Sequence, residues 1–292
     1  MNIGEKIKTL RIQRQMTQAE LAGESVSRNM VSLIENGRAT PSIQTLEAIA
    51  EKLRVTTAFL TADEREQVLL SKSEILADVR LAFAGKNYRI CSDLCRTLYN
   101  RGVEKDDEID LVMAESLMEN AREAFKEDRV RLCCTLLDEA VFYAERTMYY
   151  TDHIVSAAWL FFEYLSILSP TLVSENLPSE FLPSAAAERD VFCRYMSAVL
   201  AGDGALTSRP DDPVYAPLLE AHLRARHLMR EGNYEQASLG LSEILRSPDL
   251  LPGVVMYHVF GDMEECCRRS GNRKNETNCR EAKLSIAQKL LS

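Results

Sequence analysis

One segment, Met16 to Pro41, constrains the fold of this chain more than any other. It reads MTQAELAGESVSRNMVSLIENGRATP and contains two short helical patterns on either side of a turn. Thr17 can cap the first helix, because Glu20 three residues later completes the pattern of a capping box. Ser27 can cap the second helix, and Gly37 suits the left-handed residue at which a helix stops. Two helices joined in this way form a helix-turn-helix.

The second helix of the pair has a buried side and a polar side. Val31 and Ile34 form its apolar stripe, with Met30 beside them. In a helix-turn-helix this helix enters the major groove of DNA, where Arg can read guanine, Asn can read adenine and Leu can touch a thymine methyl. The residues expected to face DNA are Ser27, Arg28, Asn29, Ser32 and Leu33, followed by Asn36 and Arg38 at the phosphate backbone. For each of them, a solvated surface position is the alternative.

The residue types and spacings of this segment closely resemble those of the phage-repressor/Cro-like (Xre) helix-turn-helix family, over residues 3 to 60. The positions that agree are Thr17, Gln18, Glu20, Leu21, Ala22, Val26, Ser27, Arg28, Val31, Ser32, Ile34, Glu35, Asn36, Gly37, Pro41, Ser42 and Leu46. The chain departs from the family pattern in having four residues between Ala22 and Ser27 where five are common, so a tighter turn is predicted at Gly23–Ser25. The resemblance implies that Arg11 pairs with Glu35 and braces the first helix against the recognition helix. Two independent surface charges are the alternative.

Residues 1–62 are predicted to form a head of five helices. Ile3 to Gln13 is the first of them, Ser42 caps the fourth, and residues 55–60 form a short fifth. Gln18 stands at the N-terminus of the second helix, where its amide and the free backbone N–H groups can meet a phosphate. The head is therefore expected to bind double-stranded DNA.

Composition favours an all-α chain with two domains. The 292 residues include only 12 Gly and 9 Pro, fewer than average, which suits long helices better than many short strands. The net charge of -9 is unevenly divided, because residues 1–62 carry eight Lys/Arg and six Glu (+2) while the other 27 basic and 38 acidic residues give -11. An acidic remainder repels DNA, so modest and salt-sensitive affinity is expected. The asymmetry fits a small DNA-reading head on a body that binds something else.

Helices are predicted throughout the rest of the chain, with a connecting helix over 63–84 and a helical body over 85–292. The body spans are 89–100, 107–125, 129–148, 152–168, 187–201, 214–230, 234–247, 252–270 and 275–291, interrupted by loop-rich segments at 170–183 and 202–217. Some inter-helix turns look alike, with spacings of 41 residues from Asn87 to Asp128 and 39 residues from Asn233 to Asn272. The short Gly-Asn-Tyr turn at residues 232–234, followed by Ala237, resembles a tetratricopeptide repeat, although these spacings exceed its repeat of about 34. The predicted body is a solenoid of degenerate tetratricopeptide-like hairpins.

Catalytic and metal-binding patterns are missing from the sequence. It contains no Gly-rich phosphate loop, Gly-x-Ser-x-Gly or His-Glu-x-x-His, which argues against an enzyme, and no cofactor is predicted. The eight cysteines fall inside helical patterns without Cys-x-x-Cys spacing, so buried thiols are favoured over a redox or metal sensor. No apolar run reaches the ~20 residues of a membrane span, and the N-terminus lacks a signal-peptide core, so a cytoplasmic protein is expected.

An Xre-type head followed by tetratricopeptide-like helices resembles the cytoplasmic peptide-pheromone receptors of Gram-positive bacteria, the Rgg/PlcR/PrgX class. The resemblance implies a homodimer that reads an inverted-repeat operator and whose body binds a short signalling peptide. Polar residues that could grip a peptide on the inner helices are Asn120, His222, Arg224 and Arg226, with a solvated helix face as the alternative for each. A body that serves only dimerisation or protein interaction is the second hypothesis.

Overall fold

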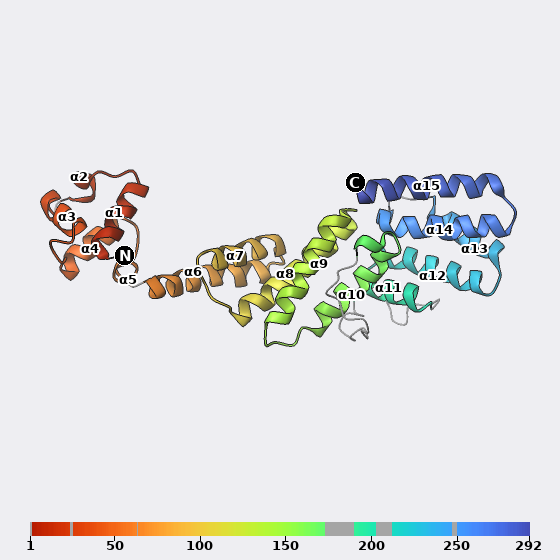
Figure 1. Ribbon diagram of the computed structural model, residues 1–292, viewed down its shortest axis with the longest axis horizontal. Coiled ribbons are helices and arrows are strands. Elements are labelled where there is room, and N and C mark those ends of the chain that lie inside the picture. Colours follow the sequence, from red (N-terminus) through yellow and green to blue (C-terminus); the bar gives the residue numbers. More distant parts are fainter. Residues whose placement is uncertain (1, 24–25, 63, 173–189, 203–211, 247–249) are drawn as a thin grey trace. The chain divides into compact units, whose positions relative to one another are not determined.

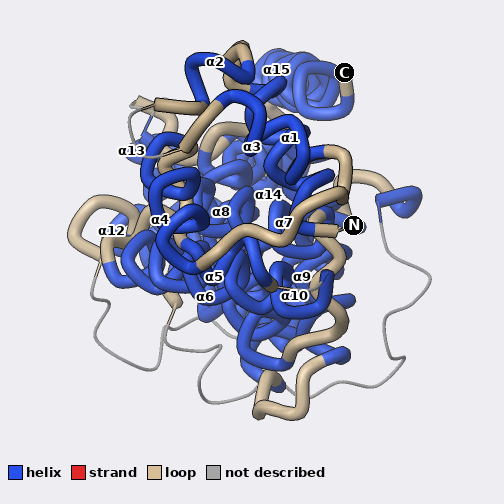
Figure 2. The backbone as a smooth tube through the Cα atoms, turned by 90° about the vertical axis from the view of Figure 1, so that its left-hand side faces the viewer, coloured by secondary structure: helices blue, strands red, loops and turns tan. Residues whose placement is uncertain are grey.

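The computed structural model describes residues 2–23, 26–62, 64–172, 190–202, 212–246 and 250–292. Every regular element in this described part is a helix, which confirms the all-α prediction (Figure 2). The chain divides into two compact units, one of residues 1–81 with 96–104 and the other of residues 82–95 with 105–292 (Figure 1). Each unit has a buried core of its own.

The head contains five helices, as predicted. They are α1 (Ile3–Gln13), α2 (Gln18–Leu21), α3 (Arg28–Glu35), α4 (Ile43–Lys52) and α5 (Thr57–Thr61). Thr17 and Glu20 form the predicted capping box, and Gly37 takes the left-handed conformation with φ of 69°. The fifth helix begins at Thr57, later than the pattern indicated, because the side chain of Thr56 accepts the amide of Phe59 and caps it. The predicted tight turn includes residues 24 and 25, which lie outside the described part.

The core of the head is a single apolar cluster to which the helices of the head contribute. Its members include Ile7, Leu21, Val31, Ile34, Ile49, Leu53 and Leu60. Two lysines stabilise the ends of short helices. Lys6, only 3% exposed, donates to the carbonyl oxygens of Leu60 and Ala62 at the end of α5. Lys52 donates to the carbonyl oxygens of Glu20 and Ala22 at the end of α2. These charges satisfy C-terminal carbonyls that a short helix leaves unpaired.

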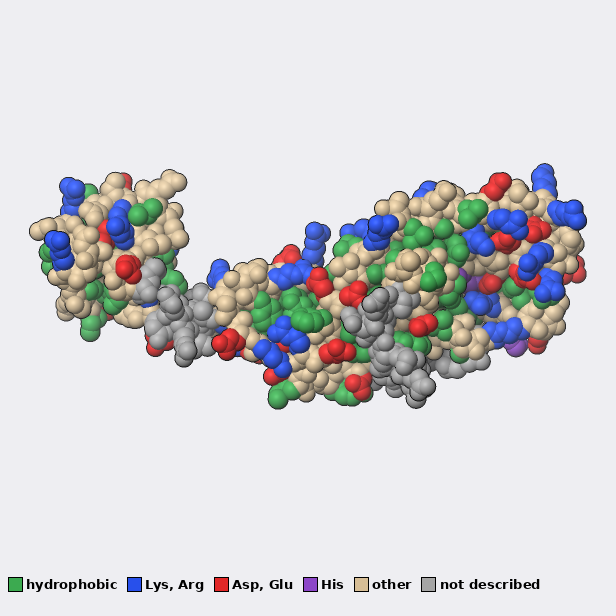
Figure 3. All heavy atoms as spheres, viewed as in Figure 1, with side chains coloured by type: hydrophobic (Ala, Val, Ile, Leu, Met, Phe, Trp, Pro, Cys, Tyr) green, Lys and Arg blue, Asp and Glu red, His purple; other side chains and the backbone are tan. Residues whose placement is uncertain are grey.

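The rest of the chain follows the predicted succession of helices. They are α6 (Glu64–Ala84), α7 (Tyr88–Asn100), α8 (Asp107–Lys126), α9 (Val130–Arg146), α10 (Asp152–Ser166), the 3-10 turn η1 (Pro170–Leu172), α11 (Val191–Ala201), α12 (Ala216–Arg230), α13 (Tyr234–Ile244), α14 (Gly253–Arg269) and α15 (Arg273–Leu291). The pairs α8–α9, α12–α13 and α14–α15 pack most extensively, each as a helical hairpin with a short turn. On the face seen in Figure 3, acidic and basic side chains of the body are interspersed.

Aromatic side chains join the hairpins of the body. The ring of Phe125 on α8 lies edge-on to Phe161 on α10 at 5.0 Å and to Phe192 on α11 at 5.4 Å between centroids. Offset and edge-on pairs of this kind stabilise beyond their buried area. The end of α15 also returns to α9, where Arg131 donates to the carbonyl oxygen of Leu291 at 2.6 Å. All eight cysteines are buried, which agrees with the packing role that the sequence favoured.

Candidate nucleic-acid interface and the polar groups of the body

Helix α3 presents one polar face to solvent. Val31, Ile34 and Glu35 are buried, and the helical period places the opposite side near Asn29 and Leu33. Burial assigns the predicted contact residues as follows: Ser27, Arg28, Asn29, Asn36 and Arg38 are exposed, and Ser32 and Leu33 are half-buried. The structure therefore gathers these side chains in and just beyond the second helix of the helix-turn-helix.

Two of the predicted contact residues also stabilise α3 itself. The hydroxyl of Ser27 accepts the amide of Met30 at 3.2 Å and caps the N-terminus. The amide of Asn36 donates to the carbonyl oxygen of Ser32 at 2.8 Å, at the end of the helix. Arg28 and Asn29 make no hydrogen bond or ion pair with another described side chain, so both are free to contact a base edge.

The orientation of α3 is fixed by a buried carboxylate. Arg11 on α1 donates two hydrogen bonds to Glu35, at 2.6 and 3.1 Å, and a third to the carbonyl oxygen of Met16 at 2.8 Å. Paired bonds of this geometry hold both partners in one orientation. Burial alone would raise the pKa of Glu35, but the bonds from Arg11 and Gln18 and the charge of Arg11 lower it. Glu35 is therefore ionised at neutral pH and joins the three helices.

Gln18 has a different environment from the one predicted. It stands at the N-terminus of α2 as expected, but its side-chain amide donates to Glu35 at 2.8 Å. The same side chain thus supports the Arg11–Glu35 pair. Contact with a phosphate would fall to the backbone amides at this helix end, which suit an anion.

One exposed residue of this region was missed as a candidate. Met30 is 40% exposed, at the edge of the polar face of α3, although the sequence pattern grouped it with the apolar stripe. Its position one residue before Val31 moves it about 100° around the helix from that buried side chain. This angular offset is the signal that could have identified it.

The four residues proposed to grip a peptide lie in different environments. Arg224 is exposed on α12, whereas Asn120 on α8 is half-buried and donates to the hydroxyl of Ser92 at 3.3 Å. Arg226 is half-buried, with its Nε 3.7 Å from a carboxylate oxygen of Asp262. His222 is fully buried and both of its ring nitrogens are engaged, so it belongs to the core and does not offer a surface contact.

His222 is the centre of a buried hydrogen-bonded chain. Its Nε2 lies 2.8 Å from Asp262 and its Nδ1 lies 2.8 Å from the hydroxyl of Tyr195. A carboxylate can only accept, so the Nε2–H group of His222 donates to Asp262. Tyr164 completes the chain by donating to Tyr195 at 3.4 Å. The chain links α10, α11, α12 and α14, and the adjacent His258 is kept neutral because burial lowers its pKa to about 3.

A second pair of polar side chains joins two helices of the body. His153 on α10 lies 2.7 Å from a carboxylate oxygen of Glu115 on α8, and both side chains are 31% exposed. The sequence did not identify this pair, because the two residues are 38 positions apart and neither carries a motif. Half-buried groups of this kind can exchange their mutual bond for bonds to a ligand.

Comparison with known proteins identifies the domain type of the head. A helix-turn-helix family model matches residues 7–60. The immunity repressor protein of Bacillus phage phi105 is 37% identical over 65 residues, which are 22% of this chain and 45% of the repressor. The matched region thus spans less than half of that relative. The predicted helix-turn-helix domain is therefore confirmed. The chain carries, near its N-terminus, the kind of domain with which regulators bind DNA.

Solved structures of three regulators align with nearly the whole chain. Bacillus thuringiensis PlcR, in complex with the peptide PapR7 and DNA, is 15% identical over 98% of this chain and 94% of PlcR, with a TM-score of 0.24. The apo form of the competence regulator ComR from Streptococcus vestibularis is 15% identical over 98% and 91%, with a TM-score of 0.23. The SHP pheromone receptor Rgg2 of Streptococcus dysgalactiae is 12% identical over 97% and 99%, with a TM-score of 0.19. PlcR and Rgg proteins are of the class that the sequence resembles, but superposition this loose places no residue of the body.

Within the described residues, no helix combines the length and apolar character needed to cross a membrane.

Proposed function

We propose that this protein is a sequence-specific DNA-binding transcriptional regulator that reads DNA with α3. The observation that carries the proposal is the polar face of α3, with Arg28 and Asn29 exposed at the start of a helix that Glu35 holds in place. Arg and Asn each make paired hydrogen bonds to one kind of base in the major groove. As a homodimer, the protein would place two such helices one turn of DNA apart, about 34 Å, on an inverted-repeat operator.

Replacing Arg28 or Asn29 by alanine is expected to weaken operator binding by about 1–3 kcal/mol at particular base pairs. Binding to random DNA should change much less, because a base contact adds little where the base is wrong. Fluorescence anisotropy with the operator and a scrambled duplex measures both. Arg273→Ala removes an exposed arginine from the start of α15 and serves as the control for lost charge. Equal losses on both duplexes would contradict base reading by α3.

Gln18→Ala is expected to behave differently. The change loosens the support of Glu35 and the N-terminus of α2, so binding to operator and to random DNA should fall by a similar factor. The same anisotropy series measures the ratio of the two affinities. A loss confined to the operator would assign Gln18 to base reading instead.

We further propose that the body senses a short peptide. Half-buried polar side chains on α8, α10 and α12 support this, namely Asn120, the Glu115–His153 pair and Arg226. Amide and charged groups of this kind can bind the backbone and termini of an extended peptide. The alternative is a scaffold for dimerisation, which the return of α15 to α9 would suit.

The two roles of the body are separated by operator anisotropy with and without fractions of spent culture medium. A shift that follows a small, protease-sensitive fraction is expected for a peptide sensor. Operator binding that is indifferent to every fraction would favour the scaffold. Asn120→Ala, with exposed Asn275→Ala on α15 as the matched control, then tests whether α8 contributes to the response.

A further inference from the structure

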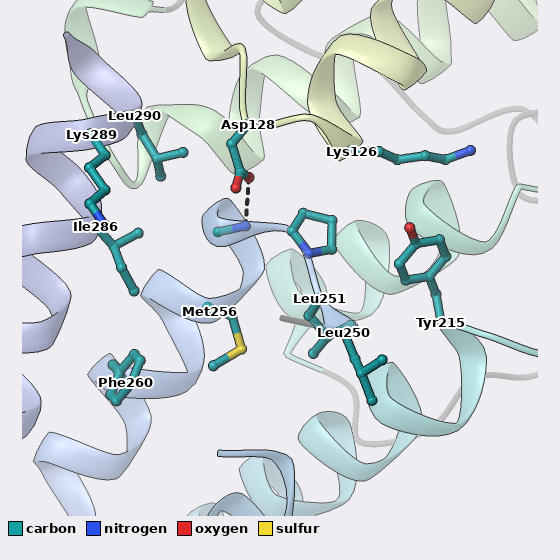
Figure 4. A pocket seen from close by; sticks show the side chains of 12 residues that line it. Lys126, Asp128, Tyr215, Leu250, Leu251, Met256, Phe260, Ile286, Lys289 and Leu290 are labelled. Atoms are coloured by element: carbon teal, nitrogen blue, oxygen red, sulfur yellow. Dashed lines mark hydrogen bonds between the residues drawn. The ribbon is translucent and has the colours of Figure 1, made fainter. Parts of the chain in front are cut away.

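The body contains a pocket of about 470 Å³ (Figure 4). Its lining includes neither the four candidate peptide-binding residues nor the buried hydrogen-bonded chain around His222. It lies where the turn after α8 meets the start of α12, the start of α14 and the last turns of α15. A pocket of this size falls within the range that holds small organic ligands.

Apolar residues and charged residues both line the pocket, and the apolar ones are in the majority. Leu251, Met256, Phe260, Ile286 and Leu290 line it from α14, α15 and the segment before α14 (Figure 4). Leu250, which is 50% exposed, also lines it and leaves an apolar side chain open to solvent. Burial of such surface by an apolar ligand is favourable by about 0.8 kcal/mol for each methylene group.

Two lysines lie among these apolar side chains, on opposite sides of the view in Figure 4. Lys126 pairs with the exposed Glu123 at 2.9 Å. Lys289 is exposed, and its ammonium group makes no hydrogen bond or ion pair with a described residue. The carboxylate in the pocket, Asp128, is already used, because it accepts the amide of Gly253 at 2.5 Å at the N-terminus of α14. Among the charged side chains that line the pocket, Lys289 is therefore the one without a partner in the described part of the chain, and its charge is positive.

The same lining disfavours a peptide as the occupant. A buried peptide backbone needs partners for each N–H and C=O group, and unpaired groups are costly. Among the described residues that line the pocket, only Tyr215 has an uncharged polar side-chain group, and Asp128 is engaged by α14. An aliphatic chain needs no such partners.

We propose that this pocket binds a medium-chain aliphatic carboxylate, with the chain among the apolar side chains and the carboxylate at Lys289. The inference does not depend on the proposed DNA or peptide functions, since binding can be measured directly on the full-length chain. A ligand here would connect the α8–α9 turn, α14 and α15. It should consequently stabilise the body against thermal unfolding, by a free energy that grows with the logarithm of the ligand concentration divided by the dissociation constant.

Isothermal titration of the full-length protein with hexanoate, octanoate and decanoate tests the pocket without any substitution. Affinity is expected to rise roughly fourfold for each added methylene, or roughly 15-fold for each step of two, until the pocket is filled. Decylamine has a similar chain with the opposite charge and should bind far more weakly than decanoate. No saturable binding of decanoate, or equal binding of decylamine, would overturn the proposal. Tighter binding of an apolar tetrapeptide with a free C-terminus would overturn the choice of ligand.

Substitutions at exposed positions locate the site. Leu250→Glu places a negative charge at the pocket, and Lys289→Gln removes the uncommitted positive charge. We expect Leu250→Glu to abolish decanoate binding and Lys289→Gln to weaken it roughly fivefold or more. Leu239→Glu on α13 and Lys274→Gln at the other end of α15 are matched exposed controls, which should bind like the unsubstituted protein. Equal binding by all four variants would place decanoate elsewhere and contradict the assignment.

Discussion

Replacing Gly4 by alanine is expected to destabilise the head by about 3 kcal/mol or more. A Cβ atom at Gly4 would lie 2.0 Å from the carbonyl oxygen of Ile34, so α1 and α3 could not keep their present separation. A domain of 62 residues is stabilised by only roughly 3–9 kcal/mol in total, so the variant should be largely unfolded in the head or close to it. Operator binding would be lost with the fold.

The effect can be localised by hydrogen exchange measured on peptides from residues 2–62 and from the body. Faster exchange is expected throughout the head, while the fluorescence of the chain's single tryptophan, Trp159 in α10, should stay unchanged. Gly240→Ala is the matched control, because the Cβ at this helical position in α13 meets nothing within 4 Å. That change should be neutral or stabilising by about 0.5–1 kcal/mol. Normal protection of the head in the Gly4 variant would show that α1 and α3 separate at little cost.

The helices of the head could be predicted because their signals are local. Thr17 with Glu20, Ser27 and Gly37 define helix ends through neighbours three or four residues away. Gly4 and Lys6 carry no such signal. In sequence, a glycine near a helix start and a lysine among charged neighbours are ordinary surface choices. Their roles come from contacts distant in sequence. The carbonyl oxygen of Ile34 lies too close to Gly4 for a side chain, and Lys6 donates to a carbonyl oxygen at the end of α5.

In the body, helix spans were predictable and side-chain roles were less so. The observed α9, α12 and α14 begin and end within a few residues of the predicted spans, because apolar periodicity is strong over long helices. The sequence analysis predicts a surface role for His222, but this residue lies between Leu219 and Leu223 on the buried side of α12. Its partners Tyr195 and Asp262 are 27 and 40 residues away, so the pairing that makes its burial tolerable could not be inferred from the sequence.

Removal of Asp262 should have the largest single effect on the body. Asp262→Ala takes away the acceptor of the His222 Nε2–H group and leaves Arg226 without the carboxylate beside it. Leaving a buried partner unpaired costs about 3–5 kcal/mol, and we expect the lower end because the Asp262 side chain is 22% exposed. Urea unfolding followed by Trp159 fluorescence measures the change. Asp138→Ala removes an exposed carboxylate from α9 and should stay within about 0.5 kcal/mol of the unsubstituted protein.

The pH dependence of this difference tests the charge of Asp262 itself. Burial alone would raise its pKa, but the hydrogen bond with His222 and the charge of Arg226 lower the pKa below its usual value. A carboxyl group with a lowered pKa stabilises the folded state above its unfolded pKa of about 3.9, and this contribution is lost as the pH falls through the folded value. The gap in unfolding free energy between the unsubstituted protein and Asp262→Ala should therefore be complete at pH 7 and shrink below about pH 4. A gap that stays constant or widens in acid would mean that the carboxyl group is already protonated in the folded body, and the buried chain would then be held by a neutral acid in place of an ion.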